Sequence, residues 1–455
     1  MTPRLDDLPF ALGRESSDFG NTREQLIWNK RLDRTRTPDL IAFPSSAHDV
    51  VNAVRYAAGH KLKISPRGSG HHYEAAALRD GGLLLDLAGL GDIAIDDDTR
   101  TAWIGAGVTG GQLIERLSER GYAFPIGHCA DVALSGYILA GGFGWNAGEW
   151  GPACANVSAV ELVTADGDIV VANERDHADL FWAARGGGPG FFAVITAYRL
   201  ELRSLPPTAF ARSLTFAAEA APHLDDWLTS ATATADRSVE VICLIGTHSP
   251  SGRPSVTVRA LACGTDEEEA GSKVASFSSP PKEAEQIAEP LEQGLAFAEL
   301  TKFSAMPAGK RVAVDHLWSE APPGDLLVAA HAFAAAPSSL STINLVFFGG
   351  RGAAPGMPDG VGAALSVGGT AGAGIYAMWD EPADDEANRA WVRQVDDALS
   401  PFRSGRYVGE AATSSDPDRV AECFKPEVLD RLSALRSRYD PKGLFFTWPG
   451  GHEAR

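Results

Sequence analysis

The chain has 455 residues, of which 44% are hydrophobic and 22% charged, and its formal net charge is −19. This length is too great for one ordinary hydrophobic core, so at least two lobes are expected. The negative charge argues against nucleic acid or an anionic membrane as a partner. No apolar run is long enough to span a bilayer, and the acidic segment 1–20 does not resemble a signal peptide. A cytoplasmic location is therefore expected.

The five cysteines are scattered along the chain and contain no CxxC pair. They therefore indicate neither a disulfide framework nor a zinc site. The adjacent His71 and His72 do not predict a metal site either, because no carboxylate cluster accompanies them. Four of the cysteines are expected to be small buried apolar residues, namely Cys154, Cys243, Cys263 and Cys423.

Short strands and helices alternate over residues 1–205. A helix capped by Ser45 or Ser46 is expected to run to about Gly59, and a second helix from about Gly111 to Gly121. Asp166-Gly167 predicts a hairpin turn between two strands within 157–171. Further strands are expected at 62–65, 82–87, 93–96, 102–105 and 192–202.

Pro206-Pro207 mark an expected boundary, after which longer strands alternate with Ala- and Glu-rich helical stretches. This pattern indicates an antiparallel sheet with helices on one face. Strands are expected at 210–216, 239–245, 255–263 and 343–349, followed by a glycine- and proline-rich loop at 349–362. Near the end of the chain, a helix is expected from Pro426 to about Tyr439.

The segment Ile64–Ala75, ISPRGSGHHYEA, is the first with chemical information. A strand ends at Pro66 and opens into Arg67-Gly68-Ser69-Gly70. Small residues let backbone N–H groups converge on an anion such as a diphosphate. A plain glycine turn explains the loop equally well, and the GxGxxG dinucleotide fingerprint is absent here. The two histidines that follow favour a binding loop.

The second informative segment is Pro125–Gly151, PIGHCADVALSGYILAGGFGWNAGEWG, which surrounds Cys129 with glycines in an apolar stretch. Such glycines permit the backbone to approach a flat or phosphorylated ligand. A glycine-rich core crossing with a structural cysteine remains the alternative. Trp145 and Trp150 either line a pocket or pack the core.

Two later segments complete the set of candidates. Residues 184–202, ARGGGPGFFAVITAYRLEL, can pack a glycine corner against a ligand. Residues 405–416, GRYVGEAATSSD, offer Tyr407 and Glu410 as an acid/base pair. For each tyrosine, a packed core residue with a hydrogen-bonded hydroxyl is the competing interpretation.

The ordered series RGSGHHYEA, GHCADVALSGYILAGGFG, VELVTADGDIV, LFWAARGGGPGFFAVIT and YDPKGLF resembles the berberine-bridge-enzyme-like flavoproteins of the vanillyl-alcohol-oxidase superfamily. The resemblance covers essentially the whole chain. It implies an α+β fold with a two-lobed, PCMH-type FAD-binding domain at 1–205, whose PCMH-type part is about 38–205. A substrate domain with an antiparallel sheet would follow at 206–400, and 401–455 would return to the FAD domain.

The resemblance also implies a covalently bound FAD. In bicovalent members of the family, the histidine at the position of His71 joins the flavin 8α carbon and the cysteine at Cys129 joins flavin C6. Val132 stands where members that react with O2 tend to have valine, which favours an oxidase. The other expected cofactor-binding residues are Arg67, Gly68, Ser69, Gly70, Ser135, Gly136, Gly141, Gly142, Gly144 and Ile195.

Five positions depart from the family pattern. His72 stands where the family usually has a small polar residue. Tyr137 replaces a histidine found near the flavin in plant members, and Phe143 replaces a tyrosine that acts as a base in sugar-type oxidases. Gly409 and Gly443 replace asparagines. These differences put any transfer of substrate specificity in doubt.

The expected reaction is hydride transfer from an alcohol, lactol or amine carbon to FAD, with O2 reduced to H2O2. A base must accept the O–H or N–H proton, and Tyr407 is the first candidate because it matches the family's tyrosine. Arg403 or Arg406 is expected to lower its pKa. His128 is interpreted as a substrate ligand, as a group that lowers the pKa of the Cys129 thiol or, equally well, as a plain loop histidine. The weaker candidates for the base are Tyr137, Glu410 and Tyr376.

Two other functions remain open from the sequence. One is a flavoprotein dehydrogenase or an oxidative cyclase of secondary metabolism. The other is a catalytically degenerate flavin-binding protein, which the loss of the expected residues at Phe143 and Gly409 keeps possible. The sequence does not identify the substrate.

Overall fold

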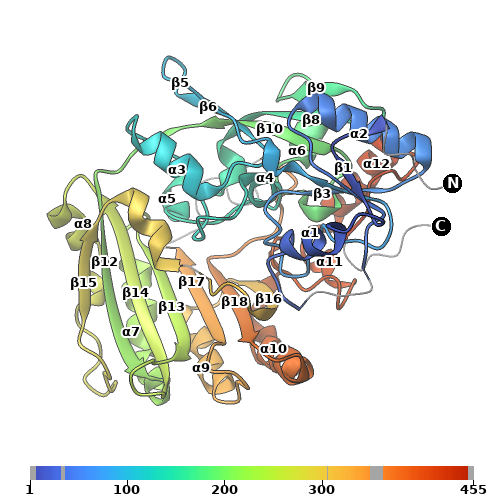
Figure 1. The fold of residues 1–455 in the computed structure, drawn as a ribbon. Helices are drawn as coiled ribbons and strands as arrows, with labels where there is room; N and C mark the ends of the chain where they lie inside the picture. The colour runs from blue at the N-terminus through green and yellow to red at the C-terminus, as the bar shows by residue number, and fades with distance from the viewer. Residues whose placement is uncertain (1–6, 32–35, 305, 349–361, 449–455) are drawn as a thin grey trace.

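The computed structural model describes residues 7–31, 36–304, 306–348 and 362–448, whose strands form sheets of four, five, two and eight strands (Figure 1). Most of the loop predicted at 349–362 lies outside the described residues. Within them, no helix combines the length and apolar character needed to cross a membrane.

The four-stranded sheet has the order β1-β2-β4-β3, with β2, β3 and β4 parallel. Helix α2 follows β2, and its N-cap is Ser46, whose side chain accepts a hydrogen bond from the Asp49 amide. The predicted cap is therefore confirmed. The elements here are β1 (Ala11–Gly13), α1 (Phe19–Gln25), β2 (Leu40–Ala42), α2 (Ala47–His60), β3 (Ile64–Arg67) and β4 (Leu83–Asp86).

The five-stranded sheet is antiparallel, in the order β5-β6-β10-β8-β9. The predicted Asp166-Gly167 turn joins β8 to β9, and Gly167 has the positive φ that favours glycine. The elements here are β5 (Ile93–Asp96), β6 (Thr101–Gly105), α3 (Gly110–Ser118), α4 (Leu134–Leu139), α5 (Ala147–Trp150), β8 (Val157–Val163), β9 (Ile169–Ala172), α6 (Ala178–Ala183) and β10 (Val194–Glu201). A small ribbon pairs β7 (Tyr122–Ala123) with β11 (Arg203–Ser204).

The eight-stranded sheet is antiparallel, in the order β15-β12-β14-β13-β17-β18-β16-β19. This confirms the α+β class expected for the middle of the chain. Its strands are β12 (Thr208–Ala217), β13 (Glu240–Thr247), β14 (Pro254–Gly264), β15 (Leu291–Leu295), β16 (Arg311–Ser319), β17 (Thr342–Phe348), β18 (Ala371–Trp379) and β19 (Arg403–Gly405). Its helices are α7 (Ala221–Thr234), α8 (Glu267–Lys273), α9 (Val328–Phe333) and α10 (Asp385–Leu399).

The two faces of this sheet have different roles. Along β13, Val241, Cys243 and Ile245 are buried in a core shared with α7, α9 and α10, whereas Ile242 and Leu244 point to the opposite face. This alternation follows from the two-residue period of a strand. Figure 1 shows these helices on the side of the sheet away from the smaller sheets. The opposite face is therefore free to line a site.

The end of the chain returns to the first sheet. Ile64 of β3 donates its amide to the Leu444 carbonyl at 2.8 Å and accepts from the Phe446 amide at 3.1 Å. Helix α12 (Pro426–Tyr439) has the predicted bounds, and α11 (Arg419–Glu422) precedes it. The domain boundaries at 205 and 400 stay a prediction.

Candidate active site

Arg67 organises the loop that follows β3. Its guanidinium pairs with Asp86 at 2.6 Å and donates to the carbonyls of Leu26 and Ser69. Gly70 has a φ of +77°, and a Cβ there would lie 2.1 Å from the Leu26 carbonyl oxygen. Only glycine fits at this position, so the loop wraps closely around the guanidinium.

This loop packs directly against the second glycine-rich segment. The Ala133 amide donates to Ser69 Oγ at 2.8 Å, across 64 residues of sequence. A Cβ at Gly68 would lie 2.8 Å from the Ala133 Cβ. The two segments singled out in the sequence are therefore neighbours in space.

Together they form one side of a cavity of about 660 Å³, and the open face of the eight-stranded sheet forms the other. Gly141 and Gly142 do not line it: both have positive φ, Gly141 packs on Leu365 and Gly142 on the Tyr137 ring. The other expected cofactor-binding residues all line the cavity, namely Arg67, Gly68, Ser69, Gly70, His71, Cys129, Val132, Ser135, Gly136, Gly144 and Ile195.

His71 faces this cavity and is held on two sides. Its Nε2 lies 2.9 Å from an Asp131 carboxylate oxygen, and its ring stacks on Trp28 with the centroids 5.4 Å apart. Burial lowers the pKa of His71, and Asp131 only partly offsets this effect. These surroundings therefore favour the neutral imidazole, which is the form that can act as a nucleophile.

Cys129 also faces the cavity, but the expectation that His128 lowers its pKa is wrong. Burial, with Asp131 and Glu410 nearby, raises the pKa of the Cys129 thiol to about 11. His128 instead places its Nε2 2.7 Å from the buried carboxylate of Glu240. Burial lowers the pKa of His128, but Glu240 outweighs this effect and raises it above its ordinary value.

Glu410 and Tyr376 form a hydrogen-bonded pair at the cavity wall, with the Tyr376 hydroxyl donating to Glu410 Oε2 at 2.7 Å. Burial raises the pKa of Glu410, and the hydrogen bond from Tyr376 opposes this rise. The Tyr73 and Tyr376 rings meet edge to face, with their centroids 5.8 Å apart. A carboxylate whose pKa is displaced toward neutrality is suited to accept a proton.

The surroundings of Tyr407 differ from those expected. Burial, followed by the charge of Glu410, raises the pKa of Tyr407 far above its ordinary value, although a backbone hydrogen bond from Gly142 opposes this. The expectation that Arg403 or Arg406 lowers this pKa is wrong. Arg406 is used in ion pairs with the three carboxylates of Asp315, Asp396 and Glu422, and Arg403 approaches the last two of these.

The remaining aromatic candidates have structural partners. The Tyr137 hydroxyl donates to the Pro125 carbonyl at 3.2 Å. Trp145 is fully buried against His128, and Trp150 packs on Phe297. The Phe143 and Tyr407 rings meet edge to face, with their centroids 5.5 Å apart.

The sheet supplies a floor opposite the glycine-rich segments. His316, Gly374 and Asn344 lie in one row across β16, β18 and β17. A Cβ at Gly374 would lie 2.6 Å from the Tyr376 ring, so glycine here makes room for that ring. Burial and the charge of Arg406 lower the pKa of His316 to about 3, so His316 is a neutral polar contact.

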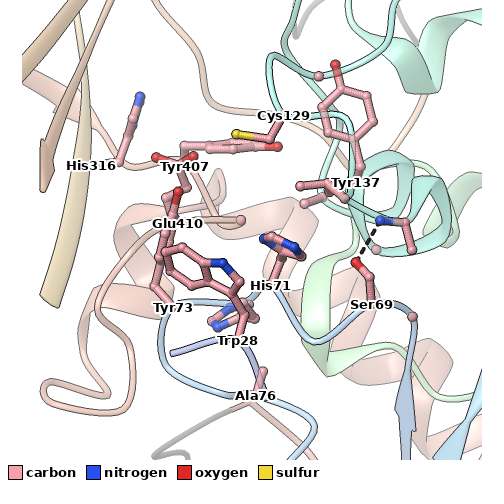
Figure 2. A pocket seen from close by; sticks show the side chains of 18 of the residues that line it. Trp28, Ser69, His71, Tyr73, Ala76, Cys129, Tyr137, His316, Tyr407 and Glu410 are labelled. Atoms are coloured by element: carbon pink, nitrogen blue, oxygen red, sulfur yellow. Dashed lines mark hydrogen bonds between the residues drawn. The ribbon is translucent and has the colours of Figure 1, made fainter. Parts of the chain in front are cut away.

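Figure 2 shows His71, Cys129, Glu410 and Tyr407 around one space, with His316 at the left of the view. Sequence reasoning missed Trp28, Tyr73, Asp131 and His316. Asp131 lies within the segment that was singled out, two residues after Cys129. Trp28 and His316 lie in stretches that carry no motif.

Comparison with known proteins identifies the family of this chain. A family model described as FAD binding domain matches residues 38–173. The (R)-6-hydroxynicotine oxidase of Paenarthrobacter nicotinovorans is 30% identical over 92% of this chain and 92% of its own length. The chain belongs to the berberine-bridge-enzyme-like FAD-linked oxidoreductases.

Other members of this oxidoreductase family are similar as well. FAD-linked oxidoreductase nodO of Hypoxylon pulicicidum is 25% identical over 94% of this chain and 93% of its own length. A match of 40% identity to pynB of Aspergillus niger covers only 40% of this chain and 33% of that protein. The structure of 6-hydroxy-D-nicotine oxidase from Arthrobacter nicotinovorans has a TM-score of 0.81, 27% identity and 96% coverage of both chains.

The residues of this FAD-linked oxidoreductase fit the cofactor. The loop Gly68–Gly70 presents backbone without large side chains, which suits a diphosphate. Val132 and Ile195 give the cavity apolar walls that suit a flat ring system. His71 and Cys129 place a neutral imidazole and a thiol on the same cavity.

Proposed function

We propose that this protein is an oxidase that carries FAD covalently through His71 and Cys129. The observation that supports it is that both side chains, which are 58 residues apart in sequence, line one cavity together with Glu410. When bound, FAD supplies the acceptor for a hydride from an alcohol, lactol or amine carbon and passes the electrons to O2, giving H2O2. The nicotine oxidase relative supports a small molecule as the substrate that is oxidised.

In this proposal, Glu410 accepts the substrate's O–H or N–H proton. Its raised pKa makes it a stronger base than an ordinary carboxylate, and its hydrogen bond to Tyr376 fixes its orientation. Burial and the charge of Glu410 raise the pKa of Tyr407, which disfavours the phenolate that this task would need. We therefore assign Tyr407 to binding and orienting the substrate, together with Phe143.

The face of the eight-stranded sheet holds the rest of the substrate. Ile242, Leu244 and Val346 give it an apolar surface, and His316 and Asn344 add polar contacts. Such a site is typical of small-molecule pockets, where a few polar groups orient a largely apolar ligand.

The test is acid precipitation of the purified protein, followed by intact mass and absorbance of the pellet. The proposal expects the yellow colour in the pellet and the mass of one FAD added to the chain. His71→Ala and Cys129→Ala should each keep one link, and the double variant none. Colour that moves to the supernatant would show a dissociable flavin. Oxygen consumption with a substrate panel then separates an oxidase from a dehydrogenase.

A further inference from the structure

The contact between His71 and Asp131 determines which imidazole nitrogen is free. Asp131 Oδ2 lies 2.9 Å from His71 Nε2. A carboxylate only accepts hydrogen bonds, so Nε2 carries the hydrogen and Nδ1 keeps an unprotonated lone pair. Trp28 stacks on the ring and restricts its rotation. The ring is therefore held in one tautomer and one orientation.

We propose that Asp131 is a positioning residue for flavin attachment, which fixes His71 with Nδ1 as the nucleophile and accepts the Nε2 proton as the link forms. This inference rests on the proposed attachment of FAD through His71. The other charge near His71 belongs to Arg67, which is paired with Asp86 and disfavours a protonated imidazole. Asp131 is thus the carboxylate that receives the proton.

Atoms and electrons balance in this step. A bond forms between His71 Nδ1 and the 8α carbon, using the nitrogen lone pair. One C–H bond of the 8α methyl breaks, and its electron pair reduces the ring system by two electrons. The methyl group releases one proton, and Nε2 releases a second one through Asp131. The reduced ring takes up two protons, so the proton count balances. O2 then accepts two electrons and two protons, leaving H2O2 and the oxidised, linked cofactor.

Asp131 has the opposite relationship to Cys129. It stands two residues after Cys129, and its negative charge helps to raise the pKa of that thiol. The same carboxylate therefore favours reaction at His71 and disfavours formation of the thiolate at Cys129. Removing it should slow one attachment without slowing the other. A purely structural role for Asp131 would slow both.

The experiment follows each attachment separately. Full-length apoprotein from riboflavin-depleted cells is mixed with FAD in air-saturated buffer, and covalent FAD is measured over time by intact mass and in-gel flavin fluorescence. With Cys129→Ala as background, Asp131→Asn should slow attachment at His71 by about 100-fold, the low end for a positioned base, and Asp131→Glu should restore most of the rate. With His71→Ala as background, Asp131→Asn should attach at an equal or higher rate.

Asp97→Asn is the matched control, because Asp97 is also an exposed, ion-paired carboxylate, bonded to Arg120 away from the cavity. If Asp131→Asn leaves the attachment rate unchanged in the Cys129→Ala background, the inference is overturned while covalent FAD stays intact. Slowing in both backgrounds, or a loss of FAD binding that Asp131→Glu does not restore, assigns a structural role and overturns it too. If the wild-type chain links no FAD, the proposed attachment itself is wrong.

Discussion

The Tyr376 hydroxyl donates a hydrogen bond of 2.7 Å to Glu410, and the two side chains come from different parts of the fold. Tyr376 lies on β18 of the large sheet, whereas Glu410 lies in the loop after β19. Glu410 is also a negative charge that helps to raise the pKa of Cys129. The pair therefore joins the large sheet to the side of the cavity that carries Cys129.

Replacing Glu410 by Gln should slow substrate oxidation by about 10²–10⁴-fold, the usual contribution of a positioned base. Anaerobic stopped-flow measurement of flavin reduction checks this, because it excludes the reaction with O2. In the wild type, the reduction rate should rise with pH and level off above the raised pKa of Glu410, since only the ionised carboxylate accepts the proton. An unchanged reduction rate in Glu410→Gln would assign the base elsewhere.

Tyr376→Phe should shift this pH dependence. The hydrogen bond from Tyr376 lowers the pKa of Glu410, so its loss raises that pKa further. The rising limb of the rate profile should therefore move to higher pH, while the plateau rate falls by less than about tenfold. The same anaerobic measurement over a pH series checks the shift. An unchanged pH profile of the reduction rate would show that the ionisation of Glu410 does not control that rate.

Tyr137→Phe should leave the chemistry nearly intact, because the Tyr137 hydroxyl is already bonded to the Pro125 carbonyl. Losing that hydrogen bond should cost about 0.5–1.5 kcal/mol of the free energy of unfolding. Thermal unfolding and flavin reduction, measured on the same preparation, test both parts. A loss of reduction rate as large as that of Glu410→Gln would make Tyr137 the base.

Arg406 should matter for stability more than any exposed arginine. Its side chain is 2% exposed and pairs with Asp315 at 3.0 Å and Asp396 at 2.9 Å. Arg406→Ala would remove the fully buried partner of these carboxylates and leave them with Arg419 and, for Asp396, Arg403. The loss should cost about 3–5 kcal/mol. Arg389→Ala is the control, because Arg389 pairs with Glu386 on the exposed face of α10 and should change stability by less than about 0.5 kcal/mol. Equal Tm values for the two variants would contradict this ranking.

The sequence predicted the parts of this protein that depend on local pattern. Helix α12 runs from Pro426 to Tyr439, as predicted. The strands predicted from hydrophobic runs agree with the observed bounds of β12, β13, β14 and β17 to within two residues at each end. The strand β18 was missed, because Ala371–Trp379 contains glycines that lower strand propensity and serve the cavity floor instead.

Of the residues that line the cavity, the sequence predicted those that belong to a motif and missed those that only packing brings there. His71 and Cys129 came from the family pattern. The pKa of Tyr407 was wrongly expected to be lowered, because adjacency to Arg406 in sequence does not imply contact. The two side chains point apart, Arg406 into its carboxylates and Tyr407 toward Phe143. The partner of Glu410 is 34 residues away and depends on the sheet register.

Val132 should control the reaction with O2. It lines the cavity beside the glycine-rich segment, and family members that exclude O2 tend to have leucine at this position. Val132→Leu adds one methylene, which in an apolar pocket changes rates by at least about tenfold. Reoxidation of the reduced enzyme by O2 should therefore slow, while anaerobic reduction by substrate stays nearly unchanged.

The control for this prediction is Val132→Ala, which removes side-chain volume at the same place and should keep reoxidation fast. An artificial electron acceptor should restore turnover of Val132→Leu, because only access of O2 is affected. If reduction by substrate slows as much as reoxidation does, the leucine has disturbed substrate or cofactor binding. If neither step changes, Val132 does not gate O2, and the preference for an oxidase then depends on oxygen consumption measured with the wild type.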